Sequence, residues 1–271
     1  MSNSMDRRRL EGRRGGKLTT AFAVACAAAV IPLLEGCGGS KPAAPPVVKP
    51  TLVGNGTVNG RVTLEGTTKA EQQLPLDAAC GASSKAHDKE LPRFTRNFVT
   101  TEDGGLADVL VTLVDVPAQP IPAGTNPLVI TQRGCEYEPY VAACQVGQTI
   151  HVVNDDPLTH NIHTLPEVSG NKEVNQSQAA GAKPLDFTYE KPEEFLRFKC
   201  DVHPWMFSYV SVLNHPFHAV TDADGKFEIK GLPDGKYKVK FKHRKAGEKI
   251  QEVEIKDGKA NVDVVLKAPT A

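Results

Sequence analysis

Three residues with sulfur or imidazole donor atoms lie close together in the last third of the sequence. Cys200, His203 and Met206 follow the spacing C-x2-H-x2-M, so a thiol, an imidazole and a thioether share one seven-residue loop. A fourth donor has to come from elsewhere, and His160 follows an apolar run that ends in VVNDDPLT. Two neutral imidazoles, one thiolate and a weak axial thioether are the ligand set of a type 1 copper site. The spacing therefore predicts one copper ion that cycles between Cu(I) and Cu(II).

Each of these residues also has an ordinary alternative, because a lone Cys, Met or His in a β-protein is usually buried filler or a surface residue. Met206 is the only methionine after Met5, and its place three residues after His203 favours a shared role. His163 is a further candidate ligand, but two imidazoles three residues apart on an extended segment point to different faces. We therefore expect a structural role for His163.

The elements around these residues are predicted to be strands. Apolar residues alternate with polar ones at 58–64, a run VLVTLV occupies 109–114, and a lysine-rich alternation follows at 226–242. The pair Asp257-Gly258 is typical of a tight hairpin turn. Aromatic residues make up only 6% of the chain, so the core should consist mainly of β-branched side chains. The expected fold class is all-β.

The segments VGQTIHVVNDDPLTHNIH and FKCDVHPWMFSYVSV resemble the cupredoxin family, and the CxxHPxM loop with HNxH is most similar to its amicyanin- and plastocyanin-like members. The resemblance covers about residues 127–213 and implies a Greek-key β-sandwich. It implies His160, Cys200, His203 and Met206 as the copper ligands. It also implies that Asn161 ties the two ligand loops together by hydrogen bonds.

The resemblance further implies electron transfer. The outer edge of the His203 ring is then expected to face solvent, surrounded by Pro204, Trp205 and Phe207 as an apolar patch on which redox proteins dock transiently. A copper storage or delivery protein is the alternative, although such carriers usually contain many methionines and histidines. Multicopper oxidases need additional His-x-His ligands, so we expect an electron carrier without its own substrate rather than an enzyme.

A second resemblance concerns the flanking segments. GTVNGRVTLEG, ADVLVTLV and TDADGKFEIKGLPDGKYKV are similar to the carboxypeptidase regulatory-like, transthyretin-like β-sandwich. We expect its N-terminal part at 55–126, the cupredoxin domain inserted at 127–213, and its C-terminal part at 214–271. A tandem arrangement of two sandwiches is the alternative.

The beginning of the chain predicts export. Basic residues precede an apolar stretch at 18–34, as in a signal peptide, and LEGC at the end of residues 1–37 resembles a lipobox with Cys37 as the lipidated residue. Cys26 is a competing lipidation site, and Arg7-Arg8-Arg9 weakly resembles a twin-arginine signal. We expect a signal peptide at 1–36, a Pro-rich tether at 37–54, and a lipid-anchored protein in the periplasm or cell envelope.

The remaining cysteines and the charge complete the prediction. Four cysteines follow the lipobox, and an oxidising compartment permits a disulfide. Cys80 lies in a polar loop and Cys135 at a bend, so we pair these two and leave Cys144 as a buried small residue.

Removing the six basic and three acidic groups of residues 1–36 from the 32 of each in the chain leaves 26 basic and 29 acidic groups. This balance implies no nucleic-acid partner.

Overall fold

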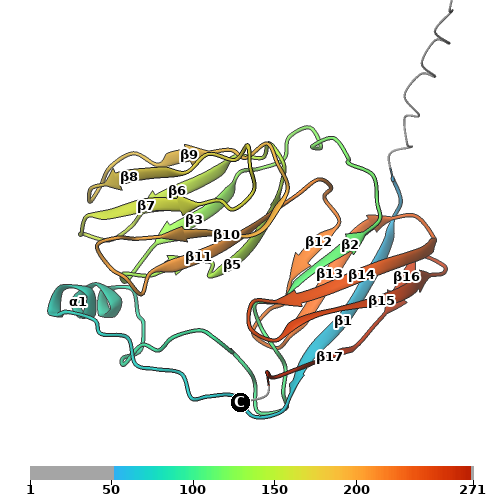
Figure 1. The fold of residues 1–271 in the computed structure, drawn as a ribbon, viewed down its shortest axis with the longest axis horizontal. Coiled ribbons are helices and arrows are strands. Elements are labelled where there is room, and N and C mark those ends of the chain that lie inside the picture. The colour runs from blue at the N-terminus through green and yellow to red at the C-terminus, as the bar shows by residue number, and fades with distance from the viewer. Residues whose placement is uncertain (1–51, 270–271) are drawn as a thin grey trace, which may run out of the picture. The chain divides into compact units, whose positions relative to one another are not determined.

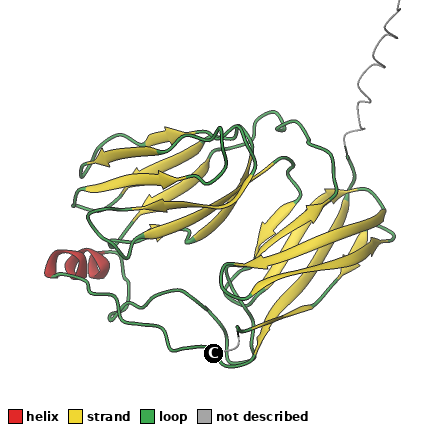
Figure 2. Cartoon of the chain, in the orientation of Figure 1, coloured by secondary structure: helices red, strands yellow, loops and turns green. Residues whose placement is uncertain are grey.

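The computed structural model describes residues 52–269, and nearly all of its regular structure is β-strand (Figures 1 and 2). The all-β prediction is confirmed. The signal peptide, Cys26, Cys37 and most of the tether lie outside the described residues. Among the described residues, no helix has the length and apolar character needed to cross a membrane.

Nine strands between residues 128 and 213 form one sandwich, which we call the inserted sandwich. Its larger sheet has the order β5-β11-β10-β7-β8, and its smaller sheet the order β4-β3-β6-β9. The bounds of the larger sheet are β5 Val141–Gln145, β11 Phe207–Leu213, β10 Glu193–Lys199, β7 His160–Leu165 and β8 Val174–Gln178. Those of the smaller sheet are β4 Tyr137–Glu138, β3 Leu128–Gln132, β6 Ile150–Asn154 and β9 Leu185–Phe187.

The core of the inserted sandwich follows from the two-residue period of its strands. In β6, Ile150, Val152 and Asn154 are buried while the residues between them are only half-buried. Because alternate side chains of a strand point to opposite faces, this pattern places one apolar row against the facing sheet. Phe198 of β10 is fully buried within the same cluster. Cys200 and Met206 also belong to this cluster, so the ligand loop lies at the edge of a packed core.

The other eight strands form what we call the host sandwich, because the chain leaves it after β2 and returns to it with β12. One sheet has the order β13-β1-β16, with β17 also paired to β1, and the other has the order β12-β2-β14-β15. The bounds are β13 Lys226–Leu232, β1 Gly56–Glu65, β16 Lys259–Asn261 and β17 Val264–Lys267. The second sheet consists of β12 His218–Val220, β2 Leu110–Val114, β14 Gly235–His243 and β15 Gly247–Ile255.

The turn at Asp257-Gly258 shows why the host strands could be recognised. Both residues have positive φ, at 52° and 77°, and Lys256 pairs with Lys259 across them. Two consecutive residues with positive φ make a turn whose twist matches that of the strands, and Asp-Gly adopts it easily. The hairpin that this dipeptide predicted is therefore present.

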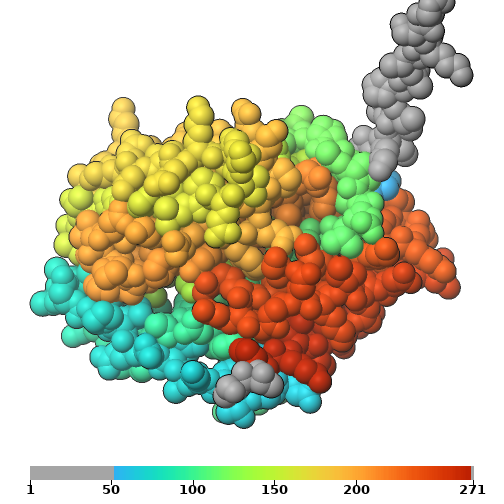
Figure 3. Space-filling view, viewed as in Figure 1, coloured from blue at the N-terminus to red at the C-terminus, as the bar shows by residue number. Residues whose placement is uncertain are grey.

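The expected division of the chain, which stays a prediction, places residues 66–105 in the N-terminal part of the regulatory-like sandwich. We call these residues the covering segment, and they form no named strand. They carry instead the helix α1 Ala78–Ala86, which is capped by Asp77 Oδ1 accepting from the Cys80 N–H. A disulfide from Cys80 to Cys135 attaches this helix to the inserted sandwich. Figure 3 shows the segment in cyan beside the orange strands.

Candidate metal centre

Three of the four predicted ligands lie at the ends of neighbouring strands, and His203 lies in the loop between β10 and β11. His160 begins β7, Cys200 directly follows β10, and Met206 directly precedes β11. Since β10 pairs with both β7 and β11, these strand ends lie side by side at one end of the sheet. The loop is closed by two backbone hydrogen bonds, from Cys200 N–H to the Met206 carbonyl and from Met206 N–H to the His203 carbonyl. Antiparallel pairing thus brings donors from distant parts of the sequence together.

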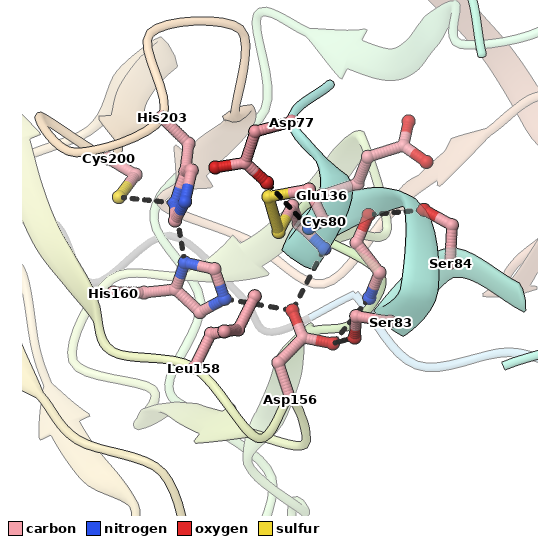
Figure 4. Close-up of a disulfide and its surroundings, with 12 residues drawn as sticks. Asp77, Cys80, Ser83, Ser84, Glu136, Asp156, Leu158, His160, Cys200 and His203 are labelled. Atoms are coloured by element: carbon pink, nitrogen blue, oxygen red, sulfur yellow. Dashed lines mark hydrogen bonds and ion pairs between the residues drawn. A yellow bond between two sulfur atoms is a disulfide. The ribbon is translucent and has the colours of Figure 1, made fainter. Parts of the chain in front are cut away.

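The donor atoms converge on a small buried volume (Figure 4). The Nδ1 atoms of His160 and His203 are 2.9 Å apart, and Cys200 Sγ lies 3.7 Å from His203 Nδ1. The ligand atoms of these three residues all lie within 4.8 Å of one another. His160 is fully buried and Cys200 is 1% exposed. Met206 is buried in the same cluster.

The other nitrogen of His160 is held by a carboxylate that sequence reasoning did not single out. Asp156 Oδ2 lies 2.8 Å from His160 Nε2, and the Asp156 side chain is completely buried. An ionised carboxylate only accepts hydrogen bonds, so in the neutral ring Nε2 carries the proton and Nδ1 keeps its lone pair. Asp156 therefore selects the tautomer that can bind a metal through Nδ1. The only signal in the sequence was an acidic residue four positions before His160.

Asp156 also connects three parts of the chain. Its carboxylate accepts hydrogen bonds from the Ser83 hydroxyl of α1 and from the backbone N–H groups of Gly134 and Cys135. Burial opposes ionisation of this group, but these donors and His160 hold its pKa well below the usual value. The charge is thus retained at the inner edge of the site.

The two free cysteines within residues 52–269 have opposite environments, although both are buried. Burial raises the pKa of the Cys144 thiol to about 12. Burial acts in the same direction on Cys200, but His160 and the backbone N–H groups of Asn161 and His203 outweigh it, so the pKa of Cys200 is lowered. The thiolate is the metal-binding form of cysteine. Cys200 is therefore the more readily ionised of the two thiols.

The two imidazoles also respond to their surroundings. Burial would lower the pKa of His160, but Asp156 and Cys200 raise it above the usual value. Burial and the neighbouring His160 lower the pKa of His203. The two rings therefore differ in how readily they take up a proton, and a metal would bind only the neutral form of each.

Asn161 lies where the resemblance implied. Its Oδ1 accepts a hydrogen bond of 2.6 Å from the Asp201 N–H and lies 3.3 Å from Cys200 Sγ, so it joins β7 to the ligand loop. His163 is oriented elsewhere: its Nδ1 is 2.9 Å from Asp201 and its Nε2 is 2.8 Å from Glu173. The structure therefore gives His163 two carboxylate partners and keeps it out of the donor set.

The expectation that the outer edge of His203 faces solvent is wrong. His203 is only 7% exposed, because the covering segment brings the disulfide over it. The sulfurs of Cys80 and Cys135 and a ring nitrogen of His203 lie within 4.8 Å of one another. Figure 4 shows the disulfide of Cys80 beside His203. The long-range contact of α1 with this loop has no signature in the local pattern around His203.

The residues predicted to surround His203 remain at the surface. Pro204 is exposed, and Trp205 and Phe207 are half-buried. The Trp205 ring lies 5.5 Å from that of His203, and its Nε1–H donates to the Cys135 carbonyl. Trp205 is thus in contact with both the candidate ligand His203 and the disulfide-bonded Cys135.

The residues present fit copper. Two imidazole nitrogens and one cysteine sulfur are close enough to share an ion, and the loop supplies a buried thioether in Met206. A His2Cys set with a thioether is typical of type 1 copper, whereas structural zinc sites use four strong nitrogen or sulfur ligands. The chemistry of the donor set therefore fits copper better than a structural zinc ion.

Comparisons with known proteins give likenesses in structure alone. A nitrite reductase described as Cu-containing, from Thermus scotoductus SA-01, is 23% identical, with a TM-score of 0.30 over 37% of this chain and 28% of its own. A purple cupredoxin from Nitrosopumilus maritimus is 22% identical, with a TM-score of 0.27 over 31% of this chain and 98% of its own. The Cu(I) form of an amicyanin mutant is 20% identical, with a TM-score of 0.29 over 38% and 97%. No protein-family model and no curated protein matches the chain.

Proposed function

We propose that this protein is an electron carrier with one type 1 copper ion held by His160, Cys200, His203 and Met206. The observation that carries the proposal is the convergence of three buried donors: Cys200 Sγ lies 3.7 Å from His203 Nδ1, and that nitrogen lies 2.9 Å from His160 Nδ1. When bound, copper supplies one-electron exchange between Cu(II) and Cu(I). The chain contributes fixed donors in a water-excluding core, which keeps structural change small when an electron passes.

Each ligand has a defined role in this proposal. Cys200 is the thiolate and Met206 the weak axial donor, while His160 and His203 offer Nδ1. Asp156 orients His160, and the disulfide screens His203 from water. The residues that hold the two imidazoles in place come from separate segments of the chain. The positions of the donor atoms therefore depend on the whole fold rather than on the ligand loop alone.

The chain is proposed to work as a membrane-tethered carrier in the periplasm or cell envelope, lipidated at Cys37. Redox proteins would dock where Trp205 and Phe207 reach the surface beside Pro204. Trp205→Ser should leave the visible spectrum of the copper form intact but slow electron exchange with a cupredoxin-accepting cytochrome in stopped-flow mixing. Unchanged rates would place docking elsewhere.

The one-electron role is tested by a reductive titration of the copper-loaded protein. The expected result is one electron taken up per chain, fully reversible on reoxidation, in the wild type and in Cys144→Ser. Cys200→Ser should lose this reversible one-electron reduction, because the serine hydroxyl cannot replace the thiolate ligand. A Cys200→Ser protein that titrates like the wild type would refute the proposal.

A further inference from the structure

A cavity of about 300 Å³ lies beside the ligand loop, next to Met206 and Trp205. The covering segment supplies Phe94 and Arg96 to its lining, and the turn after β14 supplies Arg244. The metal ligands reach it only through Met206, so the cavity is a feature separate from the donor set. Its size matches a small organic molecule with one ring.

Two guanidinium groups lie close to the aromatic wall of this cavity. The Cζ atoms of Arg96 and Arg244 are each 5.2 Å from the centroid of the Tyr140 ring, and Arg244 also lies 3.5 Å over the ring of Tyr209. Arg244 donates to the Tyr140 hydroxyl. Two like charges around one phenol ring create a positive potential in the space between them.

The protein balances only part of this positive charge. Within the described part of the chain, Arg96 pairs with Asp108, whereas Arg244 forms no ion pair with a carboxylate. The one acidic residue of the lining, Glu136, is already engaged by Lys89 and Arg93. Within the same described residues, the buried Nε of Arg96 has no hydrogen-bond acceptor. A buried donor without an acceptor is costly and indicates a missing partner.

We propose that this cavity binds a small organic carboxylate that carries an aromatic ring. A planar carboxylate matches the paired donors of a guanidinium group. The ring would lie among the side chains of Trp205, Phe207 and Phe94, of which Phe94 is 47% exposed. The residues that line the cavity therefore account for both the carboxylate and the ring of the proposed ligand.

The chain offers a direct probe, because Trp205 is its only tryptophan and lines the cavity. Benzoate is added to the metal-free full chain, and the emission excited at 295 nm is followed. The expected dissociation constant is about 1 mM or lower. Acetate lacks the ring and benzyl alcohol lacks the charge, so each should bind at least about tenfold more weakly. Because this experiment uses the metal-free protein, its result does not depend on whether the copper proposal is correct.

Single substitutions test whether benzoate binds in this cavity. Arg244→Gln should weaken benzoate binding at least about tenfold, and Phe94→Ala, at the exposed rim, about threefold. Arg133→Gln is the matched control, because Arg133 pairs with Asp155 and does not line the cavity; its affinity should stay within about twofold of wild type. The inference is overturned if benzoate binds no better than benzyl alcohol, or if Phe94→Ala or a folded Arg244→Gln binds as wild type does.

Discussion

The buried carboxylate of Asp156 should lower the reduction potential of the copper centre, and Asp156→Asn should raise it. Asp156 Oδ2 is 2.8 Å from His160 Nε2 and its side chain is inaccessible to solvent. A negative charge near the site stabilises the more positive Cu(II) state. Removing that charge while keeping an amide oxygen as acceptor therefore favours Cu(I).

The size of the shift follows from the distance. An ion bound to Nδ1, on the opposite side of the ring, would lie about 7 Å from the carboxylate. With an effective dielectric constant of about 20, one unit charge at this distance is worth about 2 kcal/mol, or about 100 mV for one electron. The donors from Ser83, Gly134 and Cys135 already offset part of the charge. We therefore expect an increase of about 50–100 mV.

The potential is measured by spectroelectrochemistry at constant pH. Asp155→Asn is the matched control, because Asp155 is adjacent in sequence but forms a surface ion pair with Arg133, where both side chains are more than 40% exposed. Solvent screens that charge, so its removal should change the potential by less than about 20 mV. A blue Asp156→Asn protein with an unchanged or lower potential would refute the reasoning. So would an equal shift in both variants.

Three further perturbations test the fold. Burial and Arg244 lower the pKa of His243 to about 4, and its Nδ1 accepts from backbone N–H groups. As the pH falls from 6.5 to 4, the unfolded chain takes up a proton before the folded protein does, so the free energy of unfolding should fall by up to about 3 kcal/mol. Urea titrations would show this fall, and a smaller one in His243→Gln. Replacing Cys80 and Cys135 by Ser opens a loop of 55 residues and should cost about 4 kcal/mol of unfolding free energy; a loss below about 1 kcal/mol would contradict this. Residues 127–213 with Cys135→Ser should fold alone, with dispersed NMR amide signals, because their core is continuous; a disordered spectrum would show that the host sandwich or the covering segment is required.

The sequence allowed prediction of features that depend on local pattern. The period of two in β14 and the Asp-Gly turn after β15 are local, so they predicted strands and a hairpin. Cys200, His203 and Met206 share one loop, and their spacing alone indicated a metal site. The pair Cys80 and Cys135 was found because few cysteines remained to be assigned.

Features that depend on tertiary contact were not predictable in this way. Asp156 is one of two adjacent aspartates, and only the fold makes it buried while Asp155 remains at the surface. The covering segment has no strand period, and α1 is a short helix whose position depends on Cys80 and on the hydrogen bond from Ser83 to Asp156. The exposure of His203 was therefore overestimated, because the segment that covers it is remote in sequence.

The visible and EPR spectra of the Cu(II)-loaded protein test the central claim most directly. A thiolate that donates charge into Cu(II) produces an intense blue colour, so the wild type should be blue. Cys200→Ser should lose the colour, and Cys144→Ser, which replaces the other buried free thiol, should keep it. A Cys200→Ser protein as blue as the wild type, or a wild type without the colour, would contradict the assignment of Cys200 to a type 1 copper centre.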